Sequence, residues 1–200
     1  VYLRGNIRSV EGLFQEITGF SGSFAPESPV ATIATVEDGP GSPLFISDLS
    51  MGLTSLYFHW RLRHASARDL VLTNVKGSLI NNREAGDLYG ANIGGAPWNL
   101  QFPQKAWFRQ FNPETFRGIN VLNNGGDLWI HGMKTERTTT AVKTVGGGRT
   151  EAHGAFHLGQ WPGAEDVPVY ETVDSALSAT FRTRGSGSNS FTTTAVELRS

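Results

Sequence analysis

A nine-residue segment of this chain recurs twice at a constant spacing. The three copies begin at Pro103, Gly125 and Gly147, and their alignment places Trp107 on Trp129. The spacing of about 22 residues lies in the range of roughly 20–50 residues that is typical of repeat architectures. It constrains the fold strongly, because every copy must form an equivalent structural unit that packs on its neighbours.

Two earlier segments, residues 44–49 and 70–75, resemble each other at a slightly longer spacing. Each unit is a short alternating run flanked by glycine and asparagine, which is typical of a strand between turns. One unit cannot bury a hydrophobic face alone, whereas stacked units bury a continuous core. We therefore expect an all-β fold, a single-stranded β-solenoid with coils of about 22–26 residues and two or three strands per coil. A β-sandwich is the alternative, although its strands recur about every 8–12 residues.

The aligned units indicate which side chains face inward, because successive side chains of a strand point to opposite sides. One alternating set is uncharged and mostly small or apolar: Ala106, Phe108, Gln110, Leu128, Ile130, Gly132, Thr150, Ala152 and Gly154. The other set carries the charges and the indole rings: Lys105, Trp107, Arg109, Asp127, Trp129, His131, Arg149, Glu151 and His153. Burial of so many ionised groups is too costly. The first set is therefore predicted to face the core and the second to face outward.

Stacked coils about 4.8 Å apart would arrange the outward set in three columns. The columns are, first, Lys105, Asp127 and Arg149; second, Trp107, Trp129 and Glu151; third, Arg109, His131 and His153. Indole rings beside Arg, His and Glu suit a sugar polymer, whose rings have apolar faces and hydroxyl edges. The candidate substrate-binding residues are Trp107, Arg109, Asp127, Trp129, His131, Glu151 and His153. The alternative is a solvated or covered face, in which such neighbours stabilise the sheet by about 0.2–1 kcal/mol per pair.

Several runs of the sequence resemble the C-terminal coils of bacterial pectate-lyase-like proteins, which are related to pectin-degrading glycoside hydrolases. The runs are residues 106–114, 123–136 and 146–151, with a weaker likeness at residues 20–24 and 38–42. The resemblance extends from about Gly12 to Leu177. It implies a right-handed parallel β-helix, export from the cell and a carbohydrate context. It assigns no catalytic residue, and it implies that the chain is the C-terminal part of a longer secreted protein.

The whole chain, residues 1–200, is expected to form one β-helix domain. Residues 159–168 include Trp-Pro and are predicted to form a loop that leaves the coil. The threonine-rich residues 191–200 are predicted to form a terminal strand. Asparagines are predicted at coil corners, where their amides satisfy turn backbone groups: Asn74, Asn81, Asn82, Asn92, Asn123 and Asn124.

A carboxylate pair for glycoside hydrolysis is hard to find in the sequence. Such a reaction usually needs two carboxylates about 5–9.5 Å apart, and only Asp127 and Glu151 are expected on neighbouring coils of the outward face. Against a catalytic role, Lys105 and Arg149 should flank Asp127 and hold it ionised as a structural partner. The sequence therefore does not establish whether the protein is a lyase or a glycoside hydrolase, and it assigns no catalytic residues.

No metal site is predicted. A lyase would need Ca²⁺ held by several oxygen ligands, but the aspartates are scattered: Asp38, Asp48, Asp69, Asp87, Asp127, Asp166 and Asp174. Two imidazoles, His131 and His153, could bind Zn²⁺ only with a third ligand, so a stacked pair without metal is favoured. Ca²⁺ is the one cofactor to consider, and only if the protein is a lyase.

The net charge of −1 and the absence of a basic block give no indication of nucleic-acid binding. No apolar run approaches the roughly 20 residues that span a bilayer. Two functions remain. The first is a secreted protein directed at extracellular polysaccharide, by binding or by cleavage. The second is a structural β-solenoid that self-associates through its coil ends or its outward Trp face into a fibre or surface appendage.

Overall fold

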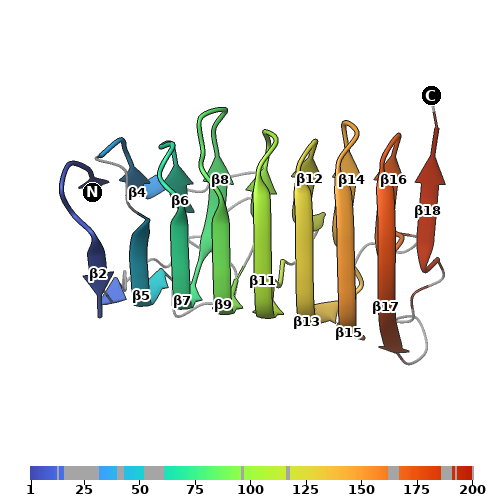
Figure 1. The fold of residues 1–200 in the computed structure, drawn as a ribbon. Helices are drawn as coiled ribbons and strands as arrows, with labels where there is room; N and C mark the ends of the chain where they lie inside the picture. The colour runs from blue at the N-terminus through green and yellow to red at the C-terminus, as the bar shows by residue number, and fades with distance from the viewer. Residues whose placement is uncertain are drawn as a thin grey trace.

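The computed structural model describes residues 1–12, 14–15, 32–39, 43–51, 61–95, 97–115, 118–161, 167–185, 191 and 193–199. These residues form two nine-membered parallel sheets and no helix. Successive strands stand side by side from one end of the molecule to the other, and the two termini lie at opposite ends (Figure 1). The described part of the chain contains no helix that is long and apolar enough to cross a bilayer.

From β3 onward the strands alternate between the two sheets along the chain. Sheet A contains, in spatial order, β1 (Tyr2–Leu3), β4 (Thr32–Val36), β6 (Arg61–His64), β8 (Ser78–Asn81), β10 (Trp98–Leu100), β12 (Ile119–Asn124), β14 (Thr140–Val145), β16 (Tyr170–Val173) and β18 (Ala195–Leu198). Sheet B contains β2 (Ser9–Glu11), β5 (Leu44–Met51), β7 (Leu70–Lys76), β9 (Leu88–Gly94), β11 (Lys105–Asn112), β13 (Asp127–Arg137), β15 (Arg149–Trp161) and β17 (Ala176–Gly185), with β3 (Phe14–Gln15) also pairing with β5. This architecture confirms the expected parallel β-helix, with two strands per coil.

The register between coils follows the sequence repeat. Trp107 pairs with Trp129, and Leu44 pairs with Leu70, as the two sequence spacings predicted. Two coils are shorter than expected, because Leu70 pairs with Leu88 and Leu88 pairs with Ala106. The segments that connect the strands are shorter in these two coils, and the strands themselves stay in register.

The predicted inward positions are confirmed for the first two residues of each unit and wrong for the third. Six side chains are buried at 2 % exposure or less: Ala106, Phe108, Leu128, Ile130, Thr150 and Ala152. By contrast, Gln110, Gly132 and Gly154 have positive φ angles of 55°, 74° and 69°. Left-handed backbone interrupts the alternation, so the following residue takes the inward place. Those residues are Phe111, Met133 and Ala155, and all three are buried.

This left-handed column continues toward the N-terminal coils. Asp48, Asn74 and Asn92 occupy the equivalent positions, with φ values of 53°, 58° and 55°. Asparagine, aspartate and glycine tolerate this conformation best. Asn74 and Asn92 were predicted at coil corners, but they lie within β7 and β9, and their amides donate to side chains rather than to turn backbone groups. Their left-handed backbone recurs in every coil from β5 to β15.

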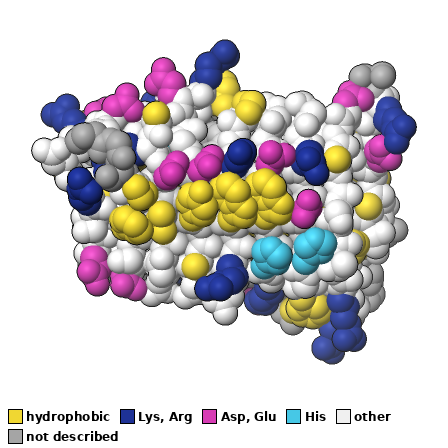
Figure 2. Space-filling model, in the orientation of Figure 1, with side chains coloured by type: hydrophobic (Ala, Val, Ile, Leu, Met, Phe, Trp, Pro, Cys, Tyr) yellow, Lys and Arg dark blue, Asp and Glu magenta, His cyan; other side chains and the backbone are white. Residues whose placement is uncertain are grey.

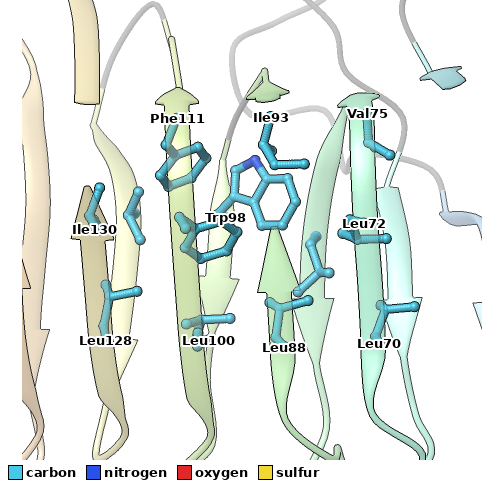
Figure 3. Packing of buried hydrophobic residues seen from close by; sticks show 14 of the residues in the cluster. Leu70, Leu72, Val75, Leu88, Ile93, Trp98, Leu100, Phe111, Leu128 and Ile130 are labelled. Carbon is cyan, nitrogen blue, oxygen red and sulfur yellow. The ribbon is translucent and has the colours of Figure 1, made fainter. Parts of the chain in front are cut away.

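The core lies between the two sheets and contains an aromatic cluster (Figure 3). Trp98 of β10 makes edge-to-face contacts with Phe108 and Phe111 of β11, with ring centroids 5.3 and 5.5 Å apart. Gly90 makes the cluster possible, because a Cβ atom there would lie 2.5 Å from the Phe108 ring. The indole nitrogen of Trp98 donates a hydrogen bond to the Gly95 carbonyl, so its burial leaves no polar group unsatisfied.

Polar side chains fill the corner that leads from sheet A to sheet B. Asn123 donates to the carbonyls of Gly126 and Arg149 and accepts from the Gly126 amide, which links adjacent coils as the asparagine prediction implied. Two coils earlier, the Asn81 amide donates to Phe102 O and to Gln104 Oε1. Buried polar groups with full partners stabilise one specific arrangement.

Residues 159–161 belong to β15, which therefore extends into the range predicted for a loop. Residues 162–166 lie outside the described residues. In the C-terminal range 191–200, the described strand is β18, which pairs with β16.

Candidate functional site

The outer face of sheet B carries the three predicted columns in the predicted register. Lys105, Asp127 and Arg149 are successive Cα partners, and so are Arg109, His131 and His153. Figure 2 shows a row of hydrophobic side chains along this face, with charged side chains on one side and two histidines on the other. The structure thus brings all seven predicted binding residues onto one face.

Asp69 and Asp87 directly precede β7 and β9, next to the first paired residues of these strands, and so continue the charged column toward the earlier coils. Asp69 accepts a hydrogen bond of 2.9 Å from the backbone amide of Asp87. Burial, and then the negative charge of Asp69, raise the pKa of Asp87. Ion pairs within 4.0 Å occur elsewhere among the described residues, at Lys134, Lys143 and Arg199. The described column residues form no ion pair within 4.0 Å, and their charges alternate in sign only from Asp87 to Arg149.

The second column is a stack of aromatic rings. The Tyr89 and Trp107 centroids are 4.8 Å apart with planes 5° from parallel, and the Trp107 and Trp129 centroids are 4.9 Å apart at 6°. Because these separations equal the strand spacing, the rings lie across the axis and present their edges to solvent. Both faces of Trp107 are covered by its neighbours, so it cannot provide a flat platform for a sugar ring. The sequence did not predict Tyr89 in this column, because its coil is shorter than the repeat.

The third column combines a guanidinium with two imidazoles. The rings of His131 and His153 are 6.1 Å apart and inclined by 41°. No group of three His, Cys, Asp or Glu side chains within the described residues is placed to hold a metal ion. Thr180 is the next residue of the column, and its hydroxyl oxygen lies 3.4 Å from Nδ1 of His153.

An open hollow of about 300 Å³ lies between the aromatic stack and the third column. Its lining includes the outward side chains Val71, Thr73, Tyr89, Ala91, Trp107, Arg109 and His131. Ala91 is the smallest of these and lies between Thr73 and Arg109 in register. The hollow therefore has one aromatic wall, a floor of small residues and a basic end.

On each strand from β5 to β9, the residue after the third-column position belongs to a ladder of hydrogen-bonded side chains. The Asn92 amide donates to Asn74 Oδ1 at 2.7 Å, and the Asn74 amide donates to Asp48 Oδ1. All three residues are exposed. The left-handed backbone places two consecutive side chains outward on each strand, which is why this ladder lies beside the hollow.

The predicted carboxylate pair is not associated with this hollow. Asp127 aligns with Arg149, and Glu151 aligns with Trp129, so the two acids lie on neighbouring coils two positions apart. Neither residue lines the hollow. The arrangement gives no support to Asp127 and Glu151 as an acid–base pair.

A second acidic pair was not found from the sequence, although its members are separated by the repeat length itself. Lys134 bridges Glu114, at 3.6 Å from Nζ to Oε1, and Glu136, with which it makes a close ion pair. Burial, and then the charge of Glu136, raise the pKa of Glu114. Ion pairing with both glutamates raises the pKa of Lys134 against the opposing effect of its burial. Lys134 therefore links two adjacent coils through its ion pairs.

His157, a histidine for which the sequence predicts no role, is completely buried inside the last coils. Its Nδ1 lies 2.9 Å from Thr135 Oγ1, and its Nε2 lies 3.0 Å from the hydroxyl of Tyr170. Burial lowers the pKa of His157 to about 4 and raises the pKa of Tyr170. The ring is therefore neutral at pH 7 and belongs to the core.

Comparison of the chain with protein-family models, with curated proteins and with solved structures finds no match.

Proposed function

We propose that this chain is an exported carbohydrate-binding β-helix, and that a linear polysaccharide lies along the outer face of sheet B. The hollow beside the aromatic stack carries this proposal. Binding sites for organic ligands combine apolar walls with a few polar groups that fix orientation. The hollow has both, with Tyr89 and Trp107 on one side and Arg109 and His131 at its end.

The geometry favours a polymer because every feature of this face runs along the solenoid axis. The aromatic stack from β9 to β13, the charged column from β11 to β15 and the amide ladder from β5 to β9 each advance by one residue per coil, at about the 4.8 Å strand spacing. A chain of sugar rings lying along the hollow would meet ring edges on one side and amide groups on the other. The resemblance to pectate-lyase-like proteins is consistent with this ligand class.

Binding, rather than cleavage, is the function that these residues support. Hydrolysis needs two carboxylates facing one bond, and none of the described residues that line the hollow is a carboxylate. Asp127 and Glu151 lie outside it, and the Glu114 and Glu136 pair shares a lysine.

The test is affinity gel electrophoresis against a panel of soluble plant and bacterial polysaccharides. Ala91→Trp would fill the floor of the hollow and should abolish the retardation shown by the native chain. Asn99→Trp is the matched control, because Asn99 faces outward from β10 on sheet A, away from the hollow. Equal retardation of both variants, or no retardation of the native chain by any polymer, would contradict the proposal.

Assembly into a fibre is a second candidate function, and the C-terminal end of the solenoid favours it. Within the described residues no strand pairs with the outer edge of β17 or β18. The inward residues of β17, namely Leu177, Ala179 and Phe181, are only half-buried. Unpaired edges are templates for strand addition.

Sedimentation velocity separates this function from the first. Assembly would give species larger than a monomer that disappear in Ala179→Asp, because a charge would then occupy the uncovered end of the core. Monomers at all concentrations would exclude assembly through this end.

A further inference from the structure

We infer that the aromatic column contains one open step, above Val71, which holds a single neutral pyranose ring between Phe45 and Tyr89. This inference rests on the proposed carbohydrate function and assigns a binding position within the same face. It is drawn from the spacing of the strands, the exposure of the two rings and the charges beside them.

The open step follows from the register. Phe45, Val71 and Tyr89 are successive partners in β5, β7 and β9, at the positions that lead to Trp107. The rings of Tyr89, Trp107 and Trp129 stack at one ring per coil. Valine has no ring, so the stack ends at Tyr89, and the next ring in register is Phe45, two coils away.

The size of the gap matches one ring. Two strand spacings separate Phe45 from Tyr89, or about 9.6 Å. Each ring contact within the stack occupies 4.8 to 4.9 Å between centroids. One additional ring between Phe45 and Tyr89 would therefore restore the same spacing on both sides.

The gap is open to solvent. Phe45 is 49 % exposed and Tyr89 is 38 % exposed, the largest values for the described aromatic side chains on this face. Val71 and Thr73 line the hollow on this side of Tyr89. By contrast, Trp107 has rings against both faces and offers no comparable position.

The groups at the edges of the gap indicate a neutral sugar. Asp69 precedes Val71 by two residues, and its carboxylate accepts a hydrogen bond from the backbone amide of Asp87, two residues before Tyr89. Carboxylates accept hydrogen bonds from hydroxyl groups and repel an anionic ring. On the opposite edge, Thr73 provides a hydroxyl that both donates and accepts. An aromatic side chain on each side, with hydrogen-bonding groups at the edges, matches a hexopyranose, and the two carboxylates disfavour a uronate at this step.

The decisive variant is Val71→Trp, which fills the open step with a ring of the protein itself. Isothermal titration with three hexasaccharides, of β-1,4-glucose, β-1,4-mannose and α-1,4-galacturonate, provides the readout. The native chain should bind a neutral hexasaccharide more tightly than the galacturonate. Val71→Trp should weaken that binding by about tenfold or more, the equivalent of losing two ring contacts.

Val71→Ala is the matched control, because it leaves the step open and should keep binding within about threefold. Unchanged thermal unfolding of Val71→Trp, or a higher midpoint, shows that the fold is intact. Asp69→Asn provides an independent variant, and it should reduce the preference for neutral over anionic hexasaccharide.

The outcomes separate this inference from the proposed function. If the native chain binds polysaccharide and Val71→Trp binds equally well, the open step is wrong while the proposed function stands. A preference of the native chain for galacturonate also overturns the inference alone. If the native chain binds no polysaccharide, both are overturned.

Discussion

Two sets of aromatic rings, one in the core and one on the outer face of sheet B, contact rings from other strands in different ways. Inside, Trp98 meets Phe108 and Phe111 edge-on, at interplanar angles of 80° and 86°. Outside, the Trp107 ring lies within 6° of parallel to both of its neighbours in the column. The inner rings come from both sheets and fill a shared volume, whereas the outer rings come from one sheet and follow its register.

The sequence repeat determines the outer stack but not the inner cluster. Register alone places one outer ring above the next, so a repeat in the sequence is enough to predict the outer stack. The inner cluster depends on a partner from sheet A and on the missing side chain at Gly90. Stability should therefore depend mainly on the inner set, and ligand recognition on the outer set.

Adjacent residues of β11 offer the sharpest test of this contrast. Phe108→Ala should lower the free energy of unfolding by about 3–5 kcal/mol, because it removes a fully buried ring and leaves a cavity. Trp107→Ala, one residue earlier and half-buried, should cost about 1 kcal/mol. Urea unfolding followed by circular dichroism measures both. Equal losses would show that the outer stack is as important to the fold as the core.

The inner set also contains a titratable ring, His157, which packs against Tyr170 and Phe181. Its pKa falls from 6.5 to about 4 on folding, so the unfolded chain binds the proton first as pH decreases. The free energy of unfolding should therefore fall between pH 6.5 and about 4, by up to about 3 kcal/mol. Urea midpoints measured across this range provide the test.

His157→Asn should flatten most of this pH dependence. The part that remains is expected from His64, whose pKa burial also lowers. A variant that keeps the full slope would show that another group is responsible.

The sequence predicted the outer face of β11, β13 and β15 and only part of the interior. Alternation and the repeat spacing identified the three columns, because side-chain direction and strand register are local properties. The same alternation failed at Gln110, Gly132 and Gly154, where positive φ angles reverse the direction of the following side chain. A single sequence does not reveal that reversal unless the residue is Gly or Asn, and Gln110 is neither.

The candidate site was predicted only in part: Trp107, Arg109 and His131 line the hollow, whereas the other four predicted residues do not. The hollow depends on Tyr89 and Ala91, which belong to a short coil and escaped the repeat alignment. The covered faces of Trp107 were also missed, because spacing predicts that rings are neighbours but not how their planes are oriented. The roles of His157 and of Lys134 likewise needed contacts between coils that alternation does not show.

A smaller effect is expected at the glycine that makes room for the inner cluster. Gly90→Ala would bring a Cβ atom against the Phe108 ring, and overpacking of this kind costs about 1–3 kcal/mol. Phe108→Leu should recover part of that loss in the double variant, although it is destabilising alone. Additive losses in urea unfolding would mean that Gly90 is needed for another reason.

The smallest effect concerns the outer rings themselves. A double-mutant cycle of Trp107→Leu and Trp129→Leu should give a coupling energy of about 0.5–1.5 kcal/mol, which is typical of an aromatic pair. Asn99 and Leu122, outward register partners on sheet A, provide a control pair without rings, and their alanine cycle should give a coupling near zero. A Trp coupling no larger than the control would mean that the rings are parallel only because their strands are. The outer column would then contribute no cohesion of its own, and a ligand ring entering above Val71 would gain its affinity from contact with Phe45 and Tyr89 alone.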